Sequence, residues 1–326
     1  MTTKEFIIKV LLKNKNEYIS GEKISKELGI SRAAISKSVK ELKKEGYDIH
    51  SITNRGYSLM NEIDVLSKEE IYSKLLIPMD VEILNSVDST NAYCKRLIPN
   101  QKNINRIVVS NTQTKGKGRK ERNFFSPPNT GIYMSLLLNS QIKVENSLKI
   151  TLAVSVAICR VLEKLTGKKP KIKWVNDIFL GDKKIAGILT EASSSFESGI
   201  IENLIIGIGI NFSTEFFPED LTNIADSIFS KKEKKTSRNE LIVELTNEIV
   251  YLLNNIEEKY IIEEYIQKSI VIGKNIIVHY YDKTENAKVL GIDENGFLQI
   301  LTKNGENKTL SSGEISIRPV GDETWN

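Results

Sequence analysis

The chain has 326 residues, of which 40% are hydrophobic and 27% charged, and its formal net charge at pH 7 is +4. That length allows two or three domains with sizeable cores, and no window approaches the roughly 18 uninterrupted apolar residues that a membrane span needs. Charges break the short apolar run at the N-terminus and no small-residue cleavage site follows, which argues against a signal peptide. We therefore expect a chain that has no contact with a membrane.

The sequence holds two cysteines, Cys94 and Cys159, and two histidines, His50 and His279. The cysteines lie far apart and form no CxxC pair, which argues against a disulfide scaffold or a thiolate metal site and fits the reducing cytoplasm. Since residues 51–278 contain no histidine, catalysis by a Ser-His-Asp or Cys-His arrangement within them is excluded.

The first sixty residues predict a helix-turn-helix. Apolar side chains recur at helical spacing in residues 4–14, 21–28 and 32–45, which are the three predicted helices. Ser20 and Ser31 stand where the second and third helices need N-caps. The spacing of the second and third helices is that of a helix-turn-helix.

A hairpin is predicted next, with strands at 49–53 and 57–59 around a turn at 54–56. Residues 1–60 carry twelve Lys or Arg against seven Asp or Glu, so the excess positive charge of the chain lies here. We interpret residues 1–62 as a winged helix-turn-helix domain that binds DNA. The alternative is a helical protein–protein module with solvated lysines. The predicted DNA-contacting residues are Ser31, Arg32, Ser36, Lys37, Lys40 and Arg55.

Residues 63–268 mix strands and helices, which predicts an α+β domain on a mixed sheet covered by helices on one face. Ser67 is expected to cap its first helix. Strands are predicted at 81–86, 106–111, 131–138, 171–175, 185–191 and 203–211. Long helical windows cover 90–98, 145–166 and 237–268. A tight hairpin turn is predicted at Gly181-Asp182.

Residues 269–326 change character and predict a small β-barrel. Short alternating strands are separated by turn signals such as Asn304-Gly305. The predicted strands cover 276–281, 287–292, 297–301, 308–310 and 315–319.

The run at residues 115–127, KGKGRKERNFFSP, is the strongest local signal. Five of the eight residues 115–122 are basic, and Gly116 and Gly118 are interleaved with them. Glycine and like-charge repulsion disfavour a helix or strand, whereas close backbone N–H groups and cations suit a loop that folds over a phosphate. The alternative is a solvated surface loop or a nucleic-acid patch.

Four further blocks follow the same order along the chain: residues 88–91 (DSTN), 173–177 (KWVND), 181–189 (GDKKIAGIL) and 207–211 (GIGIN). Together with the basic loop they resemble the biotin protein ligase family. With the N-terminal helix-turn-helix they resemble its bifunctional form, the biotin operon repressor that is also a biotin–[acetyl-CoA carboxylase] ligase. The resemblance covers nearly the whole chain. It implies a class II synthetase-like biotin/lipoate ligase fold for the central domain and an SH3-like form for the barrel.

Joining a carboxylic acid to AMP requires the enzyme to position two anions and to stabilise phosphoryl charge, without a covalent enzyme intermediate. By the resemblance, Lys184 contacts the acid and the α-phosphate, although alone it reads as an exposed hairpin lysine. Arg119 and Asp177 complete the implied catalytic set. Asp177 could orient basic residues, hold Mg²⁺ near pyrophosphate, or begin an Asx turn together with Asn176, so no metal ligand is assigned.

Ser89, Thr90 and Asn91 stand at a helix start, where they could hydrogen-bond a urea-like ring or cap the helix. Trp174 could wall an apolar cavity or be plain core. The resemblance places the following residues around biotin or its adenylate: Ser89, Thr90, Asn91, Gln113, Gly116, Lys117, Gly118, Arg119, Arg122, Trp174, Lys184, Gly187, Gly207, Gly209 and Asn211.

The resemblance also makes residues 212–228 the adenylate-binding loop, in which Phe216 and Phe217 are candidates to stack on adenine. Glu314 and Arg318 of the barrel are further candidates to reach ATP. The family's usual basic loop reads GRGRRGR, whereas this chain has GKGRKER, so Glu121 replaces a glycine. Because Lys is not equivalent to Arg toward phosphate, we expect weaker ordering of this loop. Val175 replaces the family's usual proline, which should alter only local rigidity.

The implied function has two parts. The chain would convert biotin and ATP, with Mg²⁺, to biotinyl-5′-AMP, and then transfer biotin to a lysine of a carboxylase's biotin carboxyl carrier domain. It would also repress biotin genes by binding operator DNA upstream of them, as a homodimer promoted by biotinyl-5′-AMP. The alternatives are a ligand-sensing repressor whose ligase activity is weak or lost, and a lipoate-type ligase, which usually carries a motif ending in His-Asp.

Overall fold

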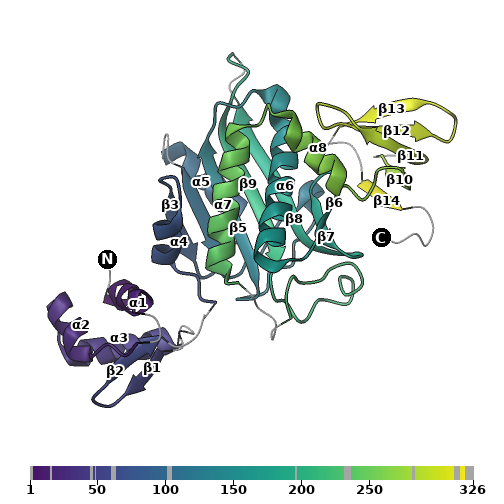
Figure 1. Cartoon of the computed structure of the whole chain (residues 1–326). Coiled ribbons are helices and arrows are strands. Elements are labelled where there is room, and N and C mark those ends of the chain that lie inside the picture. Colours follow the sequence, from purple (N-terminus) through teal and green to yellow (C-terminus); the bar gives the residue numbers. More distant parts are fainter. Residues whose placement is uncertain are drawn as a thin grey trace. The chain divides into compact units, whose positions relative to one another are not determined.

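The computed structural model describes residues 3–14, 17–44, 47, 49–59, 64–100, 105–194, 197–230, 236–280, 283–311 and 316–319. The chain divides into two compact units (Figure 1). The first comprises Met1–Lys74 with Ser237–Glu240, and the second comprises Leu75–Thr236 with Leu241–Asn326. The predicted domain boundary at 62/63 lies outside the described residues.

The first unit contains the predicted helix-turn-helix and hairpin. Its elements are α1 (Thr3–Lys13), α2 (Gly21–Leu28), α3 (Arg32–Lys44), β1 (Ile49–Ile52) and β2 (Gly56–Leu59). The predicted helices are confirmed to within one residue at each end. Both predicted caps form, because the Ser20 and Ser31 hydroxyls accept hydrogen bonds from Lys23 N and Ala34 N. The core that holds the helices to the hairpin includes Ile7, Leu11, Ile24, Ile35, Val39, Leu42, Ile49 and Leu59.

The hairpin is fixed to the segment between α1 and α2. Ile19 and Tyr57 exchange two backbone hydrogen bonds, of 2.8 and 2.9 Å. Gly56 has φ +107°, and a Cβ there would lie 2.1 Å from Ile19 O. Only glycine fits this close approach, which explains why the predicted turn carries Gly56.

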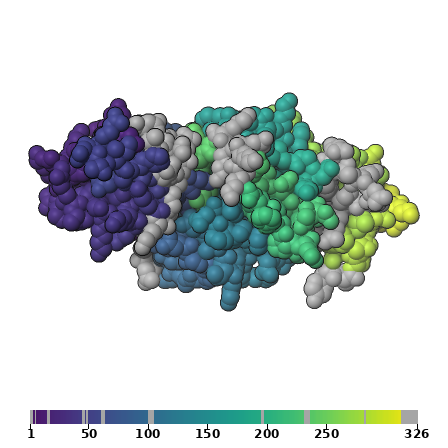
Figure 2. Space-filling model, turned by 90° about the horizontal axis from the view of Figure 1, so that it is seen from below, coloured from purple at the N-terminus to yellow at the C-terminus, as the bar shows by residue number. Residues whose placement is uncertain are grey.

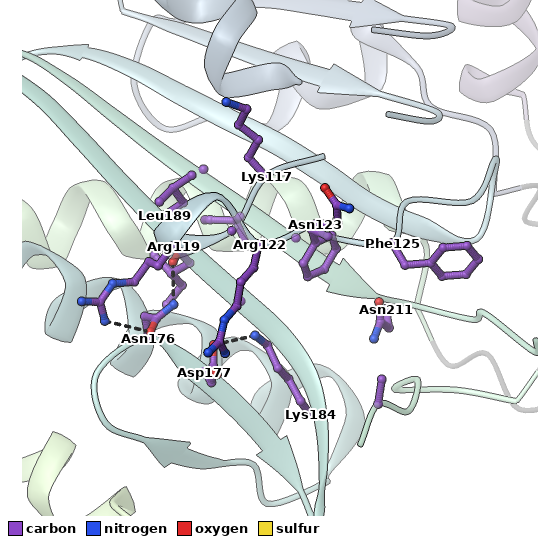
Figure 3. A pocket seen from close by; sticks show the side chains of 18 of the residues that line it. Lys117, Arg119, Arg122, Asn123, Phe125, Asn176, Asp177, Lys184, Leu189 and Asn211 are labelled. Atoms are coloured by element: carbon purple, nitrogen blue, oxygen red, sulfur yellow. Dashed lines mark hydrogen bonds and ion pairs between the residues drawn. The ribbon is translucent and has the colours of Figure 1, made fainter. Parts of the chain in front are cut away.

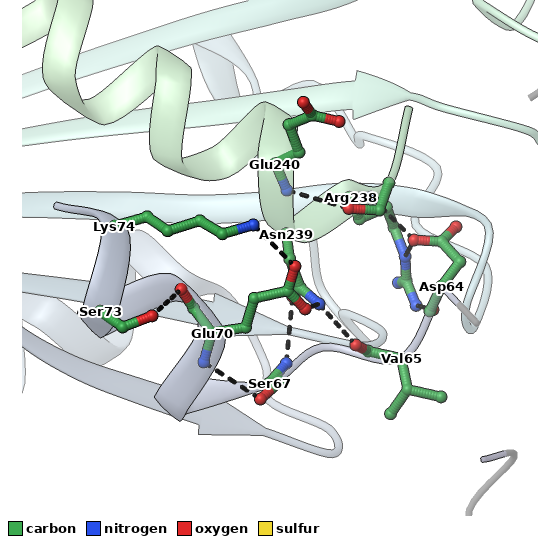
Figure 4. A network of polar contacts seen from close by, with 10 residues as sticks. Asp64, Val65, Ser67, Glu70, Ser73, Lys74, Arg238, Asn239 and Glu240 are labelled. Carbon is green, nitrogen blue, oxygen red and sulfur yellow. Dashed lines mark hydrogen bonds and ion pairs between the residues drawn. The ribbon is translucent and has the colours of Figure 1, made fainter. Parts of the chain in front are cut away.

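Ser67 caps the next helix, α4 (Lys68–Lys74), by accepting a 3.3 Å hydrogen bond from Glu70 N. Around this cap lies a buried polar network, which we call the linker clasp (Figure 4). It consists of Asp64, Val65, Ser67, Glu70, Arg238 and Asn239.

Arg238 is the centre of the linker clasp and is 1% exposed. Its backbone N–H donates to Asp64 Oδ1 at 2.8 Å, and its Nε lies 3.1 Å from the same oxygen. Asn239 donates to Val65 O at 2.8 Å and accepts from Ser67 N at 3.0 Å. The clasp thus joins residues 64–70 to the start of a helix about 170 residues further along the chain.

The second unit is built on a seven-stranded mixed sheet in the order β3-β4-β5-β9-β8-β7-β6. Its strands are β3 (Asp80–Leu84), β4 (Arg106–Ser110), β5 (Gly131–Asn139), β6 (Lys171–Lys173), β7 (Asp177–Leu180), β8 (Lys183–Ser194) and β9 (Ile201–Asn211). β3 and β4 are parallel and the other pairs antiparallel. All six predicted strands form, and Gly181, at φ +57°, turns the predicted hairpin between β7 and β8.

Three longer helices and a shorter one accompany this sheet: α5 (Thr90–Leu97), α6 (Ser147–Thr166), α7 (Arg238–Asn254) and α8 (Lys259–Lys268). A short 3₁₀ turn, Ile98–Asn100, follows α5, and another, Val144–Asn146, precedes α6. Figure 1 shows α6 and α7 lying across one face of the sheet. Arg160 of α6 bridges to Glu248 of α7 and Glu264 of α8, at 2.8 and 2.5 Å.

The predicted helical window 237–268 is wrong as a single helix, because it breaks between α7 and α8. Asn255 directly follows α7, and its side-chain amide donates to Tyr251 O at 2.7 Å. Asparagine competes in this way for helical backbone partners, and Glu258 N then turns back onto Asn255 O.

The C-terminal strands form one antiparallel sheet (yellow in Figures 1 and 2). They are β10 (Asn275–His279), β11 (Thr284–Ile292), β12 (Leu298–Thr302), β13 (Asn307–Leu310) and β14 (Ser316–Pro319), in the order β13-β12-β11-β10-β14. All five predicted strands of the small barrel are present. The turn at Gly296 packs on α6, since a Cβ there would lie 2.4 Å from Leu152 Cδ1. Among the helices described, none is long and apolar enough to cross a membrane.

Candidate active site

A cavity of about 760 Å³ lies in the second unit, at the basic loop and the β7–β8 hairpin. Of the residues predicted to surround a ligand, all but Gly116 line it: Ser89, Thr90, Asn91, Gln113, Lys117, Gly118, Arg119, Arg122, Trp174, Lys184, Gly187, Gly207, Gly209 and Asn211. Asp177 lines it as well. Gly116 lies behind the wall, where a Cβ would meet Phe124 O at 2.5 Å.

The basic loop is folded back on itself. Gly118 N donates to Arg122 O at 2.7 Å, and Phe124 N donates to Gly116 O at 2.9 Å. One 3₁₀ turn, Arg119–Glu121, lies at its tip, as expected of a loop too rich in glycine and charge for longer regular structure. Lys120 and Glu121 both have positive φ, of 53° and 56°. Side chains other than glycine disfavour this left-handed conformation by about 1–2 kcal/mol per residue.

The loop's cations point in different directions (Figure 3). Arg119 reaches Asn176, with Nη1 3.3 Å from Oδ1, and Arg122 extends toward Asp177 and Lys184. Lys117 points away from this cluster and pairs with Glu121 at 2.6 Å. Glu121 raises the pKa of Lys117, and Lys117 lowers that of Glu121.

Asp177 and Lys184 form an ion pair in the cavity, with Lys184 Nζ 2.6 Å from Asp177 Oδ1. The β7–β8 hairpin brings them together across a bulge between Ile178 and Phe179. Burial lowers the pKa of the nearby Arg119 guanidinium, and the charge of Asp177 opposes that shift. Since a guanidinium keeps its proton in proteins, the cavity holds fixed positive charge near the Asp177 carboxylate.

Three glycines form the floor of the cavity. A Cβ on Gly187 would lie 3.2 Å from Lys184 Nζ, and one on Gly209 would lie 2.5 Å from the Phe124 ring. A Cβ on Gly207 would lie 2.1 Å from Asn91 Oδ1. Side chains above these strands therefore lie directly on the backbone of β8 and β9.

The polar wall of the cavity is made at the start of α5. Ser89 caps this helix, its hydroxyl accepting from Ala92 N at 3.5 Å. Thr90 N donates to Gln113 Oε1 at 2.9 Å, and Gln113 Nε2 donates to Ser126 Oγ at 3.0 Å. Ser89 therefore caps the helix and also lines the cavity, so the two interpretations of this residue are compatible.

Trp174 lines the cavity and is also largely buried. Its indole N–H donates to Gly296 O at 3.1 Å, so the C-terminal sheet holds this wall in place. Asn211, at the end of β9, donates to Asp226 O at 3.0 Å and thereby anchors the loop at 212–228.

That loop closes one side of the cavity. Lys184 exchanges backbone hydrogen bonds with it, donating to Ile224 O at 2.9 Å and accepting from Asp226 N at 3.0 Å. Phe217 lines the cavity, with its ring centroid 6.2 Å from that of Phe125, whereas Phe216 is 83% exposed. Of the two predicted stacking candidates, only Phe217 lies at the cavity in this structure.

Sequence reasoning missed several lining residues. Phe124 covers the floor at Gly209 and packs edge-on against Tyr133, with centroids 6.4 Å apart. The signal was the NFFSP sequence directly after the basic loop. Asn176, considered before only as the start of an Asx turn with Asp177, holds Arg119 and donates to Ile188 O at 2.9 Å.

Glu314 lies outside the described residues, as does the side chain of Arg318. The described residues contain no group of three His, Cys, Asp or Glu that could hold a metal ion. Since Asp177 is paired with Lys184, the residues present do not make a protein cage for Mg²⁺.

The predicted DNA-contacting side chains of the first unit lie on α3, at its N-cap and on the hairpin. Arg32, Lys37 and Lys40 are exposed on α3, whereas Ile35 and Val39 of the same helix are buried. Ser36 is half-buried on the same helix, and Ser31 caps it. Arg55 is exposed on the hairpin, 5.5 Å from the centroid of the Tyr18 ring.

Comparison with known families agrees with the helix-turn-helix of the first unit and the cavity-bearing fold of the second. Residues 3–58 match an HTH domain, residues 83–211 match the biotin/lipoate A/B protein ligase family, and residues 271–318 match the biotin protein ligase C terminal domain. The fold and the cavity therefore define a ligase of the biotin/lipoate class that carries a helix-turn-helix domain.

The bifunctional ligase/repressor BirA of Bacillus subtilis is 32% identical over 95% of this chain and 98% of its own length. BirA of Escherichia coli is 30% identical over 93% of this chain and 94% of its own. The structure of a biotin protein ligase from Aquifex aeolicus, in complex with biotin and ATP, matches with a TM-score of 0.63 at 29% identity, covering 74% of this chain and 99% of that one. The chain belongs to the biotin protein ligase family, in its bifunctional ligase/repressor form.

Proposed function

We propose that this protein joins biotin to the AMP part of ATP, releasing pyrophosphate, and transfers the biotinyl group to a lysine of a biotin carboxyl carrier domain. The observation that carries the proposal is the Asp177–Lys184 pair beside Arg119, in the same cavity as the polar wall of Ser89 and Gln113. One end of this cavity suits a phosphoryl group and the other suits a neutral polar ring. A biotinyl-adenylate contains both.

In the first step the biotin carboxylate attacks the α-phosphorus of ATP. A carboxylate O–P bond forms, the bond to the bridging β-phosphate oxygen breaks, and pyrophosphate leaves. Lys184 Nζ, held by Asp177, stabilises negative charge on the α-phosphoryl oxygens. Arg119 and Arg122 close over the two anions and hold them in register.

In the second step the neutral amine of the acceptor lysine attacks the acyl carbon of biotinyl-5′-AMP. A C–N bond forms, the C–O bond to AMP breaks, AMP leaves, and the nitrogen loses one proton. In this proposal Trp174 walls the apolar part of biotin, and Phe217 with the 212–228 loop covers the adenine. Mg²⁺ arrives as part of the Mg·ATP substrate.

The first unit is proposed to bind operator DNA upstream of biotin genes as part of a homodimer that biotinyl-5′-AMP promotes. A single winged unit reads few base pairs, so specific sites are usually read by two units across two half-sites. Within the described strands, residues 189–194 of β8 pair with β9 on one side alone, since the β7 pairing ends at Gly187. Such an edge can pair with another chain. Substrates of this kind place the protein in the cytoplasm in this proposal.

The test of the enzyme is to incubate the protein with ATP labelled at the α-phosphate and either biotin or lipoate, and then to add a carrier domain. A labelled biotinyl-adenylate is expected first, followed by release of labelled AMP and an unlabelled, biotinylated carrier. Adenylate formed from lipoate instead would identify a lipoate-type ligase. Operator binding that responds to biotin, without any adenylate, would identify a sensor that has lost its ligase activity.

The test of the repressor is operator binding by the full chain with and without biotin plus ATP. Tighter binding to an inverted repeat in the presence of both substrates is expected. Binding that ignores them would contradict a ligand-driven dimer.

A further inference from the structure

The polar wall of the cavity is supported from behind by Glu191, a residue of β8 that sequence reasoning left without a role. Glu191 Oε2 accepts from Asn91 Nδ2 at 2.9 Å, and Leu189 O accepts from the same nitrogen at 3.1 Å. A carboxylate and a carbonyl can only accept. The amide of Asn91 is therefore held with its nitrogen toward β8 and its oxygen toward the wall.

Ser135 joins Asn91 to Thr90 by hydrogen bonds from its buried hydroxyl. Its hydroxyl is 2.6 Å from Asn91 Oδ1 and 2.7 Å from Thr90 Oγ1, and it shares its one proton between these two acceptors. Because Asn91 presents an oxygen that can only accept, the hydroxyl proton of Ser135 must point toward Asn91 Oδ1 and Thr90 Oγ1. Thr90 is then left to donate its own hydroxyl proton elsewhere.

Gln113 accepts the hydrogen bond that the Thr90 hydroxyl donates. Its Oε1 accepts from Thr90 N at 2.9 Å and from Thr90 Oγ1 at 3.2 Å, while its Nε2 donates to Ser126 Oγ at 3.0 Å. Both lone pairs of the Gln113 oxygen are thereby used. Gln113 lines the cavity, and the group that it can offer a ligand is the second N–H of its amide.

The wall has no freedom to rearrange. Thr90, Asn91 and Ser135 are all buried, and buried polar groups lose free energy when a partner is lost. The Asn91 amide also lies against the backbone of Gly207, where even a Cβ would be 2.1 Å from Oδ1. The directions of these hydrogen bonds are set together, and the anionic end of the network is Glu191.

We propose that Glu191 is a positioning residue for the ureido ring of biotin. Its carboxylate holds the Asn91 amide at the start of α5. The neighbouring Thr90, whose backbone N–H donates to Gln113 Oε1, is thereby kept in place and keeps Gln113 as a hydrogen-bond donor toward the ureido carbonyl. This inference rests on the proposed function, because it takes biotin as the ligand. The other carboxylate oxygen pairs with Lys95 at 2.6 Å, but the Lys95 side chain is 55% exposed, so that pair contributes little.

The first experiment compares Glu191→Ala and Glu191→Gln with the unchanged protein in steady-state adenylation. Glu191→Ala should raise the KM for biotin about tenfold and leave the KM for ATP unchanged, because one charge-assisted hydrogen bond to an orienting group is lost. Glu191→Gln keeps an oxygen that accepts from Asn91 and should restore most of the affinity. Lys95→Ala, the matched control, should stay within about twofold. An unchanged biotin KM in Glu191→Ala, or equal losses in Glu191→Ala and Glu191→Gln, would overturn the proposal.

The second experiment separates positioning from mere support of the fold. In 2-iminobiotin a donating guanidinium group replaces the accepting carbonyl, whereas desthiobiotin keeps the ureido ring. The unchanged protein should prefer biotin strongly over 2-iminobiotin, and Glu191→Ala should reduce that preference about fivefold or more while its preference over desthiobiotin stays the same. A purely structural role would weaken all three ligands by one factor, which would overturn the inference. A failure of the proposed function shows separately, as an unchanged protein that makes no adenylate from biotin.

Discussion

Two cation–aspartate pairs in this molecule have similar chemistry and opposite surroundings. Lys184 and Asp177 line the cavity, with side chains 33% and 27% exposed. Arg238 and Asp64 form the centre of the linker clasp, with side chains 1% and 13% exposed. Solvent access leaves the first pair able to exchange partners when an anionic ligand arrives. The second pair has neither the water nor the space to do so, and its charges serve only to hold two segments together.

The largest effect should come from breaking the buried pair. Arg238→Met keeps most of the volume but removes the guanidinium that pairs with the largely buried Asp64 carboxylate, which should lower the free energy of unfolding by about 3–5 kcal/mol. Chemical denaturation would measure the loss. The control is Arg96→Met, which breaks the exposed pair between Arg96 and Asp88 and should cost less than about 1 kcal/mol. Equal losses for the two variants would mean that burial does not distinguish the pairs.

Breaking the accessible pair should affect chemistry instead of stability. Lys184→Ala should slow adenylate formation by on the order of 10²–10³, because one donor to the developing phosphoryl charge is removed. Its thermal unfolding should match that of the unchanged protein. Lys183→Ala, one residue earlier on β8, is the control and should retain adenylation. Near-normal turnover of Lys184→Ala at saturating ATP would remove Lys184 from the mechanism.

Glu121→Gly tests the tip of the basic loop. Glycine relieves one of the two left-handed side chains and frees Lys117 from its ion pair. Ordering of the loop over the adenylate should then be favoured by about 1 kcal/mol, so that biotinyl-5′-AMP leaves roughly fivefold more slowly. Stopped-flow measurement of its release would show this. A faster release would mean that Glu121 itself helps to retain the intermediate.

The predicted DNA-contacting lysines and arginines of the first unit are exposed and should act singly. Lys37→Ala should reduce the slope of log affinity against log salt concentration by about one, if Lys37 contacts a phosphate. Titration of operator binding at several salt concentrations measures this slope, and adenylation should be unaffected. Lys26→Ala on α2, which pairs with Glu22 at 3.0 Å, is the matched control and should leave the slope unchanged.

The smallest effect concerns acid stability. The hydrogen bond from Arg96 lowers the pKa of Asp88 to about 2, below the value of about 3.9 expected in the unfolded chain. A carboxyl whose folded pKa is depressed adds stability above the unfolded pKa and loses it as the pH falls toward the folded one. The contribution should thus disappear between about pH 4 and pH 2. An NMR titration in which Arg96→Ala leaves the Asp88 pKa near 2 would contradict this cause.

Local patterns predicted most of the fold, because the signals they depend on are themselves local. The caps at Ser20, Ser31 and Ser67 and the turn at Gly181 each require a particular residue at a particular place. The break after α7 was missed, since the apolar spacing continues through it and the competing side chain is a single asparagine, Asn255.

Contacts between segments that are distant in the sequence could not be predicted from local patterns. The linker clasp joins residues about 170 positions apart, and neither Asp64 nor Arg238 stands in a motif. In the cavity, the residues within motifs were found, whereas Glu191 and Ser135 were missed. Their importance arises only when α5, β5 and β8 are brought together, because each acts on another side chain and not on the ligand.

The contact between Trp174 and Gly296 gives this protein a built-in optical reporter. The sequence holds two tryptophans, Trp174 and Trp325, so the variant Trp325→Phe would fluoresce from the cavity wall alone. The indole of Trp174 senses both the cavity that it lines and the backbone carbonyl of the C-terminal sheet to which it donates. An apolar ligand against the ring and a loss of the hydrogen bond to Gly296 would change the emission in different ways. A single unlabelled chain could thus report cavity filling and detachment of its last five strands.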